Sequence, residues 1–151
     1  MRALLQRVTE ARVEVEGMIA GSILHGLVIL LGIERSDTER EADYLITKIV
    51  GLRIFDDALG KMNKSVRDVD GELLIVSQFT LYGDCSKGRR PGFDRAARAD
   101  EAKVLYDYFI ARARATRVPV KTGVFQATMS VHLVNSGPVT LLCDSVRIDG
   151  G

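Results

Sequence analysis

The chain has 151 residues, which is the length of one ordinary domain and too short for two well-packed ones. Hydrophobic residues make up 46% and charged residues 27%, as in soluble globular proteins, so a disordered chain is excluded. Lysine plus arginine number 21 against 20 acidic residues, and the net charge of +1 excludes a uniformly basic nucleic-acid coat. Aromatic residues are 6% with no tryptophan, which argues against a large stacking platform for single-stranded RNA.

The cysteines and histidines do not form a metal-binding pattern. Cys85 and Cys143 are far apart, and with His25 and His132 they give no plausible set of four zinc ligands. We therefore expect neither a metal nor a cofactor, and nothing in the sequence requires a disulfide.

Targeting signals are not recognisable either. Residues 1–7 return to polar side chains too early for a signal peptide, and the longest apolar run, 27–32, is far too short to span a bilayer. We expect a cytoplasmic protein with a single domain over 1–151.

The first third of the chain is predicted to form strands. Apolar and charged residues alternate over 11–16, which is typical of a half-buried strand. Gly17-Met18 then indicates a turn and 19–23 a returning strand. Residues 27–31 are apolar on both faces, as in a central strand.

A helix is predicted over 37–51, because Ser36-Asp37-Thr38-Glu39 has the spacing of a capping box and apolar residues follow with helical periodicity. A short strand over 53–55 and a turn over 56–60 come next. A second fully apolar strand, 73–76, leads directly into Ser77-Gln78-Phe79-Thr80.

The second half predicts a loop over 84–94 and a helix over 100–115 with Asp100 as its N-cap. The expected inner stripe of this helix is Ala102, Leu105, Tyr106, Phe109 and Ala113. Strands over 118–121, 128–135 and 139–145 complete the chain, the last two joined at Gly137-Pro138. The order predicts a mixed α/β domain with a sheet or small barrel and helices packed on it.

A conventional hydrolase or nucleotide site is not indicated. His25 precedes a glycine at an expected turn, and His132 lies within a strand pattern, so neither reads as the base of a catalytic triad. The glycine-rich phosphate-binding motifs of nucleotide enzymes are also missing from the sequence.

Two polar segments remain as candidate sites. Ser77-Gln78-Phe79-Thr80 follows a buried strand, where side chains either line a site or merely satisfy nearby backbone. Asn135-Ser136-Gly137-Pro138-Val139-Thr140 reads as a hairpin connection. If its X–Pro bond were cis, it would instead present a rigid pair of carbonyl acceptors.

A basic loop is the third candidate. Residues 87–98 contain five cations and one acid, a net +4 that suits phosphate contacts, although a merely solvated loop is equally compatible. Lys61, Lys64 and Arg67 would extend this patch only if they folded nearby. An acidic helix start over 37–43 balances the loop, which would leave one face for a polyanion.

These segments together resemble the bacterial-type D-aminoacyl-tRNA deacylases, also described as D-tyrosyl-tRNA deacylase-like, over essentially the whole chain. The strongest matches are Ser77-Gln78-Phe79-Thr80-Leu81-Tyr82 and Asn135-Ser136-Gly137-Pro138-Val139-Thr140, the two signature motifs of the family. Further matches are Met1-Arg2-Ala3-Leu4-Leu5-Gln6-Arg7-Val8, Leu52-Arg53-Ile54-Phe55, Gly60-Lys61-Met62-Asn63, Lys87-Gly88-Arg89-Arg90-Pro91 and Leu133-Val134.

The resemblance implies a mixed, largely antiparallel sheet or small β-barrel with two main helices. It also implies a cytosolic homodimer without cofactor that hydrolyses the ester of D-aminoacyl-tRNA and also releases glycine from mischarged tRNA. Gly137-Pro138 would be cis and reach into the partner's pocket, where its carbonyls would engage the substrate amino group and exclude an L side chain.

The same resemblance assigns the site residues. Ser77, Gln78, Phe79 and Thr80 would surround the terminal adenosine and the ester. Chiral selection and substrate binding would involve the set Arg7, Met129, Asn135, Gly137 and Pro138, and tRNA binding the set Lys87, Arg89 and Arg90.

Thr80 is a candidate nucleophile of the family, but the sequence offers it no base, and we expect the 2′-hydroxyl of the tRNA to assist water instead. Two positions depart from the family pattern, namely Ser136 and Phe125-Gln126-Ala127, where many relatives carry Phe-Gly-Ala. The side chain of Gln126 is expected to reshape a wall near the pocket. The alternatives are a non-catalytic nucleic-acid-binding dimer and a small-ester hydrolase that depends on Thr80.

Overall fold

The computed structural model describes residues 1–145, so the end of the predicted domain at residue 151 lies outside the described residues. The elements in chain order are β1 (Arg2–Val15), β2 (Met18–Ile23), β3 (Gly26–Gly32), α1 (Glu39–Gly51), β4 (Phe55–Asp56), β5 (Met62–Lys64), β6 (Glu72–Ser77), the 3-10 helix η1 (Phe79–Tyr82), α2 (Ala99–Ala115), β7 (Val120–Thr122) and β8 (Ser130–Asp144).

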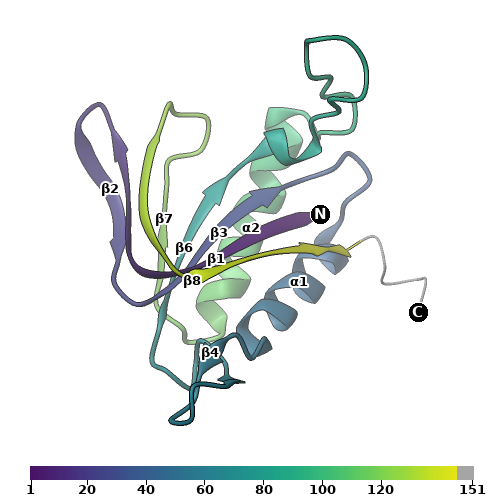
Figure 1. Ribbon diagram of the computed structural model, residues 1–151. Helices are drawn as coiled ribbons and strands as arrows, with labels where there is room; N and C mark the ends of the chain where they lie inside the picture. Colours follow the sequence, from purple (N-terminus) through teal and green to yellow (C-terminus); the bar gives the residue numbers. More distant parts are fainter. Residues whose placement is uncertain (146–151) are drawn as a thin grey trace.

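The main sheet has the strand order β2-β1-β3-β6-β7, and β8 pairs with β1 as well. β1 is antiparallel to β2, β3 and β8, whereas β6 is parallel to both β3 and β7. The sheet curls into a nearly closed barrel, and α1 and α2 lie together against one side of it (Figure 1). The predicted fold class, a mixed and largely antiparallel sheet or small barrel with two helices, is confirmed.

β1 has three partners because it is long enough to divide them between its two edges. Its first half, Arg2 to Val8, pairs with β3, and its second half, Ala11 to Val15, pairs with β2. β8 runs along the other edge of both halves. β1 therefore connects the part of the sheet beneath the helices to the part that closes the barrel.

The two faces of the sheet bury two separate apolar clusters. The first packs the helices onto the sheet and includes Leu45 and Ile49 of α1 and Phe109 of α2, all fully buried. The second fills the barrel and includes Val13, Val28 and Leu74. β3 and β6 contribute to both clusters, which explains why their sequences are apolar at consecutive positions.

Both helices begin at other residues than the sequence predicted. α1 has Thr38, not Ser36, as its N-cap, and Thr38 and Glu41 complete the capping box. Asp37 is not helical, because its carboxylate accepts hydrogen bonds from the α-ammonium of Met1 and the backbone N–H of Glu34. α2 begins at Ala99 after Arg98, without a side-chain cap from Asp100.

The inner faces of the helices agree largely with the predicted stripe. In α2, Tyr106, Phe109 and Ala113 are buried as expected, and Ile110 joins them. Ala102 and Leu105 are only partly buried. The predicted strand over 53–55 is reduced to Phe55–Asp56, which pairs with β5 in a separate two-stranded sheet.

The predicted hairpin at Gly137-Pro138 is wrong. Both flanks of this dipeptide belong to the single strand β8, and both pair with β1 in the same antiparallel direction. The register of the pairing shifts between Gln6 and Glu10 of β1, so residues 136–139 bulge out of the strand instead of reversing it. The peptide bond between Gly137 and Pro138 is cis.

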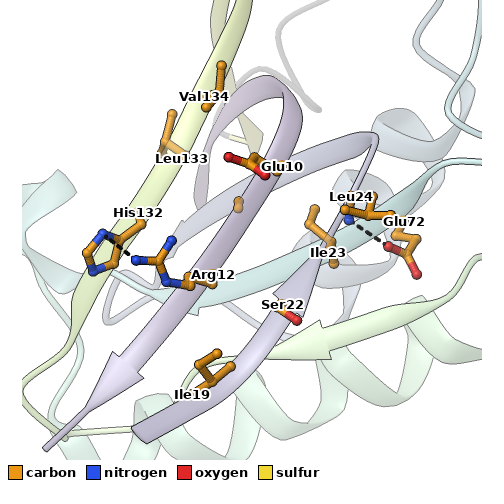
Figure 2. Close-up of a pocket in the computed structure, with 11 residues that line it drawn as sticks. Glu10, Arg12, Ile19, Ser22, Ile23, Leu24, Glu72, His132, Leu133 and Val134 are labelled. Atoms are coloured by element: carbon orange, nitrogen blue, oxygen red, sulfur yellow. Dashed lines mark hydrogen bonds between the residues drawn. The ribbon is translucent and has the colours of Figure 1, made fainter. Parts of the chain in front are cut away.

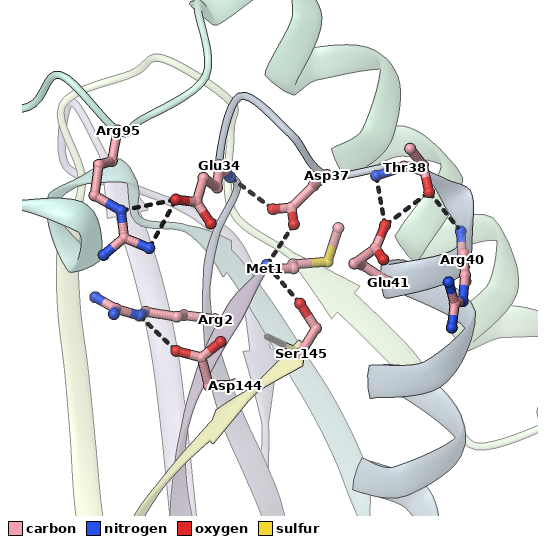
Figure 3. Close-up of polar contacts among 10 residues, drawn as sticks. All are labelled: Met1, Arg2, Glu34, Asp37, Thr38, Arg40, Glu41, Arg95, Asp144 and Ser145. Carbon is pink, nitrogen blue, oxygen red and sulfur yellow. Dashed lines mark hydrogen bonds and ion pairs between the residues drawn. The ribbon is translucent and has the colours of Figure 1, made fainter. Parts of the chain in front are cut away.

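The start of β1 is tied to the end of β8 by a polar cluster (Figure 3). The α-ammonium of Met1 is buried and donates to Asp37 Oδ1 at 2.5 Å and to Ser145 Oγ at 2.7 Å. Beside it, Arg2 Nε donates to Asp144 Oδ2 at 2.9 Å. The loop that carries Asp37 is thereby fixed against the sheet.

Candidate active site

A cavity of about 690 Å³ opens where β6 ends. Its lining includes Ser77 and Gln78 at the end of β6 and Phe79 at the start of η1. The opposite wall comes from the chain between β7 and β8, with Gln126 and Met129. Four of the residues predicted from the sequence, Ser77, Gln78, Phe79 and Met129, thus share one cavity.

The strand end positions these polar groups. The backbone N–H of Gln78 donates to the carbonyl of Leu31 at 2.8 Å, which continues the pairing of β6 with β3 by one residue. The chain then turns into η1, whose first residue, Phe79, is 55% exposed. A fixed strand end followed by a tight turn holds the Ser77 and Gln78 side chains at the cavity without burying them.

Thr80 lies beside the cavity and not in its lining. Its hydroxyl is in close hydrogen-bond contact with the side-chain amide of Gln78, which donates to it. Among the described residues, the lining contains no histidine, carboxylate, lysine or cysteine. This part of the chain therefore brings no base into the cavity to activate the Thr80 hydroxyl, and side-chain nucleophilic catalysis has no support in this geometry.

The rim of the cavity combines aromatic and cationic groups. Phe93, from the basic loop, packs edge-to-face against Phe79 with ring centroids 5.1 Å apart. Arg35 and Arg98 also line the cavity, and both are exposed. The sequence interpretation assigned Phe93 and Arg98 to the basic loop and not to the cavity, and it missed Arg35. Phe93 lies in a segment that reads as charged, and Arg35 lies outside the recognisable motifs.

Tyr82 closes the inner end of η1. Its ring is buried with the guanidinium groups of Arg2 and Arg95 over it, 4.7 and 5.4 Å from the ring centroid. Burial raises the pKa of the Tyr82 hydroxyl well above its usual range. Tyr82 therefore stays protonated and does not act as a general base near the site.

The second predicted constellation, around Gly137 and Pro138, forms a separate cluster. Arg7 is 8% exposed, and its Nε donates to the carbonyl of Ser136 at 3.1 Å while its Nη1 donates to the carbonyl of Ile54 at 2.8 Å. Gly137 has a φ of +127°, and a Cβ at this position would lie 3.0 Å from Arg7 Nη2.

Asn135 closes the bulge from its other side. Its Oδ1 accepts from the backbone N–H of Val139 at 3.2 Å, and its Nδ2 donates to Thr140 Oγ1 at 2.8 Å. Arg7 and Asn135 thus hold a segment whose two central residues, Gly137 and Pro138, are themselves exposed.

Within one chain the two constellations do not meet. Arg7 pairs with Leu27 at one end of β3, whereas Ser77 pairs with Leu31 at the other end. This offset along the strand corresponds to about 13 Å. Neither Gly137 nor Pro138 lines the cavity.

The two histidines lie outside the cavity as well. His132 is exposed in a different hollow formed by β1, β2 and β8 (Figure 2), where Arg12 Nη2 lies 3.3 Å from its Nδ1. His25 is exposed, and its ring contacts Phe55 with centroids 5.1 Å apart. Among residues 1–145, no cluster of histidine, cysteine and carboxylate side chains is placed to hold a metal ion.

The basic loop leaves η1 and returns to α2 at the upper end of the molecule (Figure 1). A bridge between Asp84 and Gly92 closes its base, and Lys87, Arg89 and Arg90 are exposed beyond it. Lys61 and Lys64 lie on the β4–β5 hairpin at the opposite end, so they do not extend this patch. No helix within the described part of the chain is long and apolar enough to cross a membrane.

Known proteins share both the sequence and the fold. The sequence profile of the family described as D-Tyr-tRNA(Tyr) deacylase matches residues 4–144. A D-aminoacyl-tRNA deacylase of Geobacter sulfurreducens is 59% identical over 145 residues, which cover 96% of this chain and 95% of that protein. The D-aminoacyl-tRNA deacylase of Geobacter metallireducens is 56% identical over the full length of both.

Two solved structures agree with the fold. That of a c-Myc DNA Unwinding Element Binding Protein superposes with a TM-score of 0.90 at 41% identity, covering 95% of this chain and 98% of that chain. The other, of a probable eukaryotic D-amino acid tRNA deacylase, has a TM-score of 0.82 at 18% identity, covers 94% of this chain and 97% of that chain, and supports the fold alone. From the profile match and the full-length identity, the chain belongs to the D-aminoacyl-tRNA deacylase family.

Proposed function

We propose that the cavity at the end of β6 binds the 3′ end of D-aminoacyl-tRNA and that a second copy of the chain completes it with its Gly137-Pro138 segment. One observation carries this proposal. Within one chain, the open cavity at the end of β6 and the exposed, firmly held Gly137-Pro138 segment are separated by about 13 Å along the strands. Water adds to the ester carbonyl, the bond to the ribose oxygen breaks, and free tRNA and the D-amino acid leave.

A row of apolar residues that is exposed at one end supports the second copy. Leu142 of β8, Leu4 of β1, Leu30 of β3 and Val76 of β6 are successive register partners across four strands. They lie on the sheet face opposite the helices, and Leu142 is 56% exposed, Leu4 and Leu30 are half-buried, and Val76 is buried in the lining of the cavity. An apolar surface that leads into the cavity is suited to a partner that covers both.

The proposed filter reads the configuration at Cα. The partner's Gly137-Pro138 backbone faces the substrate amino group and occupies the space that an L side chain requires. Glycine has no side chain and passes the same filter, so mischarged glycyl-tRNA is also a substrate. A rigid backbone element rejects L-amino acids without selecting among D-amino acids.

The decisive experiment compares tRNA charged with the D- and the L-form of one amino acid and follows loss of the ester. We expect hydrolysis of the D-ester and of glycyl-tRNA, with the L-ester left intact. Binding without turnover would favour the non-catalytic nucleic-acid-binding dimer, an alternative that the similarity to a DNA Unwinding Element Binding Protein makes worth testing. Hydrolysis of free small esters would favour the Thr80-dependent esterase.

Thr80 is expected to be dispensable for the chemical step. Loss of a general base or nucleophile costs about 100-fold or more, but Thr80→Ala should lower kcat by less than about 10-fold. The reason is that the 2′-hydroxyl of the terminal ribose, and not a side chain, assists the attacking water. A D-ester on a terminal ribose without its 2′-hydroxyl should be hydrolysed far more slowly by the unaltered protein. Near-complete loss of turnover in Thr80→Ala, with tRNA binding intact, would contradict this assignment.

The basic loop is proposed to contact the tRNA backbone. Each phosphate contact contributes about 0.7–0.9 to the slope of log Kd against log salt concentration. Replacing Lys87, Arg89 and Arg90 together by alanine should therefore lower the slope by about 2 while kcat at saturating substrate is kept. Lys61→Ala, on the distant hairpin, serves as the control, and an equal effect there would contradict a localised contact.

A further inference from the structure

Gln126 stands out in the cavity wall because of its backbone. The turn Val124 to Ala127 is closed by a hydrogen bond from the N–H of Ala127 to the carbonyl of Val124 at 3.2 Å. Its third residue, Gln126, has a φ of +62°. That conformation favours glycine, and a side chain other than asparagine or aspartate is sterically unfavourable there.

The turn itself is well supported, so the conformation of Gln126 is imposed. Phe125 is packed against the ring of Tyr106 with centroids 5.3 Å apart, and Lys103 Nζ lies 5.8 Å from the centroid of the Phe125 ring. Just before the turn, the backbone N–H of Gly123 donates to the carbonyl of Ile75 at 3.0 Å, and a Cβ at Gly123 would lie 2.7 Å from Met129 Sδ. The chain on both sides of Gln126 is therefore fixed.

The Gln126 side chain has no structural task that offsets this strain. It is exposed, and within residues 1–145 its amide makes no hydrogen bond with another residue. Yet Gln126 lines the same cavity as Ser77, Gln78 and Phe79. A strained residue that offers a free donor and a free acceptor to a binding cavity indicates a role in recognition.

The chemistry of the cavity indicates which part of the substrate it reads. Phe79 and Phe93 expose 55% and 37% of their surface, and such rings stack on a nucleobase. An amide matches adenine in particular, because its carbonyl oxygen accepts from the 6-amino group while its N–H donates to N7. A side chain carried by a fixed backbone in the wall suits the invariant part of the substrate, the terminal adenosine, better than the variable amino acid.

We infer that Gln126 is a specificity-determining residue that reads the edge of the 3′-terminal adenine through its side-chain amide. This inference rests on the proposed placement of the tRNA 3′ end in the cavity. It adds a base-specific contact to a site whose other proposed contacts concern the ester, the configuration at Cα and the phosphates.

The test compares uncharged tRNA ending in adenosine with the same tRNA ending in purine riboside, which lacks the 6-amino group. Dissociation constants are measured for both RNAs with the unaltered protein, Gln126→Gly and Asp70→Gly. Asp70 is the matched control, because it also has a positive φ, of 52°, but lies before the start of β6, at the far end from the cavity. Both glycine variants relieve the backbone and should unfold at an unchanged or slightly higher temperature.

The unaltered protein and Asp70→Gly should bind the adenosine-terminated RNA about 10-fold more tightly than the purine-terminated RNA. Gln126→Gly should lose this preference, and in deacylation of a D-aminoacyl-tRNA the loss should appear in KM with kcat largely kept. An unchanged adenosine preference in Gln126→Gly overturns the inference. So does a changed preference among D-amino acids without any change toward the base.

Failure of the proposed function would look different. If the cavity does not hold the 3′ end, the unaltered protein binds the adenosine-terminated and the purine-terminated RNA equally well. In that case both the proposed placement and the inference about Gln126 are wrong. If the placement is right and only the reading by Gln126 is wrong, the unaltered protein discriminates between the termini and Gln126→Gly does so equally.

Discussion

Gly137→Ala is expected to lower kcat/KM for D-aminoacyl-tRNA by about 100-fold or more while the protein stays folded. With a φ of +127°, the position is accessible to glycine but not to alanine without strain. The new Cβ would lie 2.9 Å from Val139 Cγ2 and 3.0 Å from Arg7 Nη2, and both atoms belong to groups that hold the bulge. The segment has to shift, and a displacement of about 1 Å at a catalytic site costs about 100-fold.

The measurement is single-turnover deacylation of D- and L-charged tRNA. Gly17→Ala is the matched control, since Gly17 has a φ of +77° but an added Cβ would contact nothing within 4 Å. It should cost stability without changing the rate or the preference for the D-form. Full activity with intact D/L discrimination in Gly137→Ala would show that this segment does not complete the site.

Asp37→Ala is expected to cause the largest loss of stability, about 3–5 kcal/mol. The Asp37 side chain is 4% exposed, and its removal leaves the buried α-ammonium of Met1 with only Ser145 Oγ as a side-chain partner among the described residues. Burial raises the pKa of the Asp37 carboxyl even beside the ammonium, so desolvation outweighs the attraction between the two charges. The predicted loss therefore arises from the cation left unpaired and not from a strongly favourable carboxylate.

Thermal or urea unfolding measures this loss, and Asp107→Ala is its control. Asp107 accepts from Lys103 Nζ at 2.6 Å in an exposed pair one helical turn apart, and such pairs contribute at most about 1 kcal/mol. Asp37→Ala should also weaken substrate binding, because the loop it anchors carries Ile33 and Arg35 to the cavity. Equal destabilisation by the two variants would contradict the assignment.

Local sequence patterns predicted the elements that are defined by their own periodicity. Helix α2 with its buried stripe and the apolar strands β3 and β6 were recognisable because each buries a regular set of side chains. The start of α1 was misplaced because Ser36 and Thr38 both fit a capping box. Only the tertiary contact of Asp37 with Met1 decides between them.

The error at Gly137-Pro138 has a different origin. Glycine followed by proline is locally a turn signal, and nothing within the segment reveals that both flanks continue along one partner strand. That continuity depends on β1, at the other end of the sequence. The candidate site behaves in the same way, since its motifs and a role of Gln126 in the pocket wall were expected from the sequence, whereas the contributions of Phe93, Arg35 and Arg98 to the cavity exist only once distant segments meet.

The pairing of β1 with β8 also determines when the selective part of the protein can form. Arg2 pairs with Asp144 and Gln6 with Thr140, so β1 must wait for β8, which follows the other described strands along the chain. On the ribosome, β1, β2 and β3 can associate early, while contacts of such long sequence separation form late. Ser77, Gln78 and Phe79 at the end of β6 can thus be in place before Gly137 and Pro138 reach their positions, and the segment proposed to exclude L-amino acids joins the fold late.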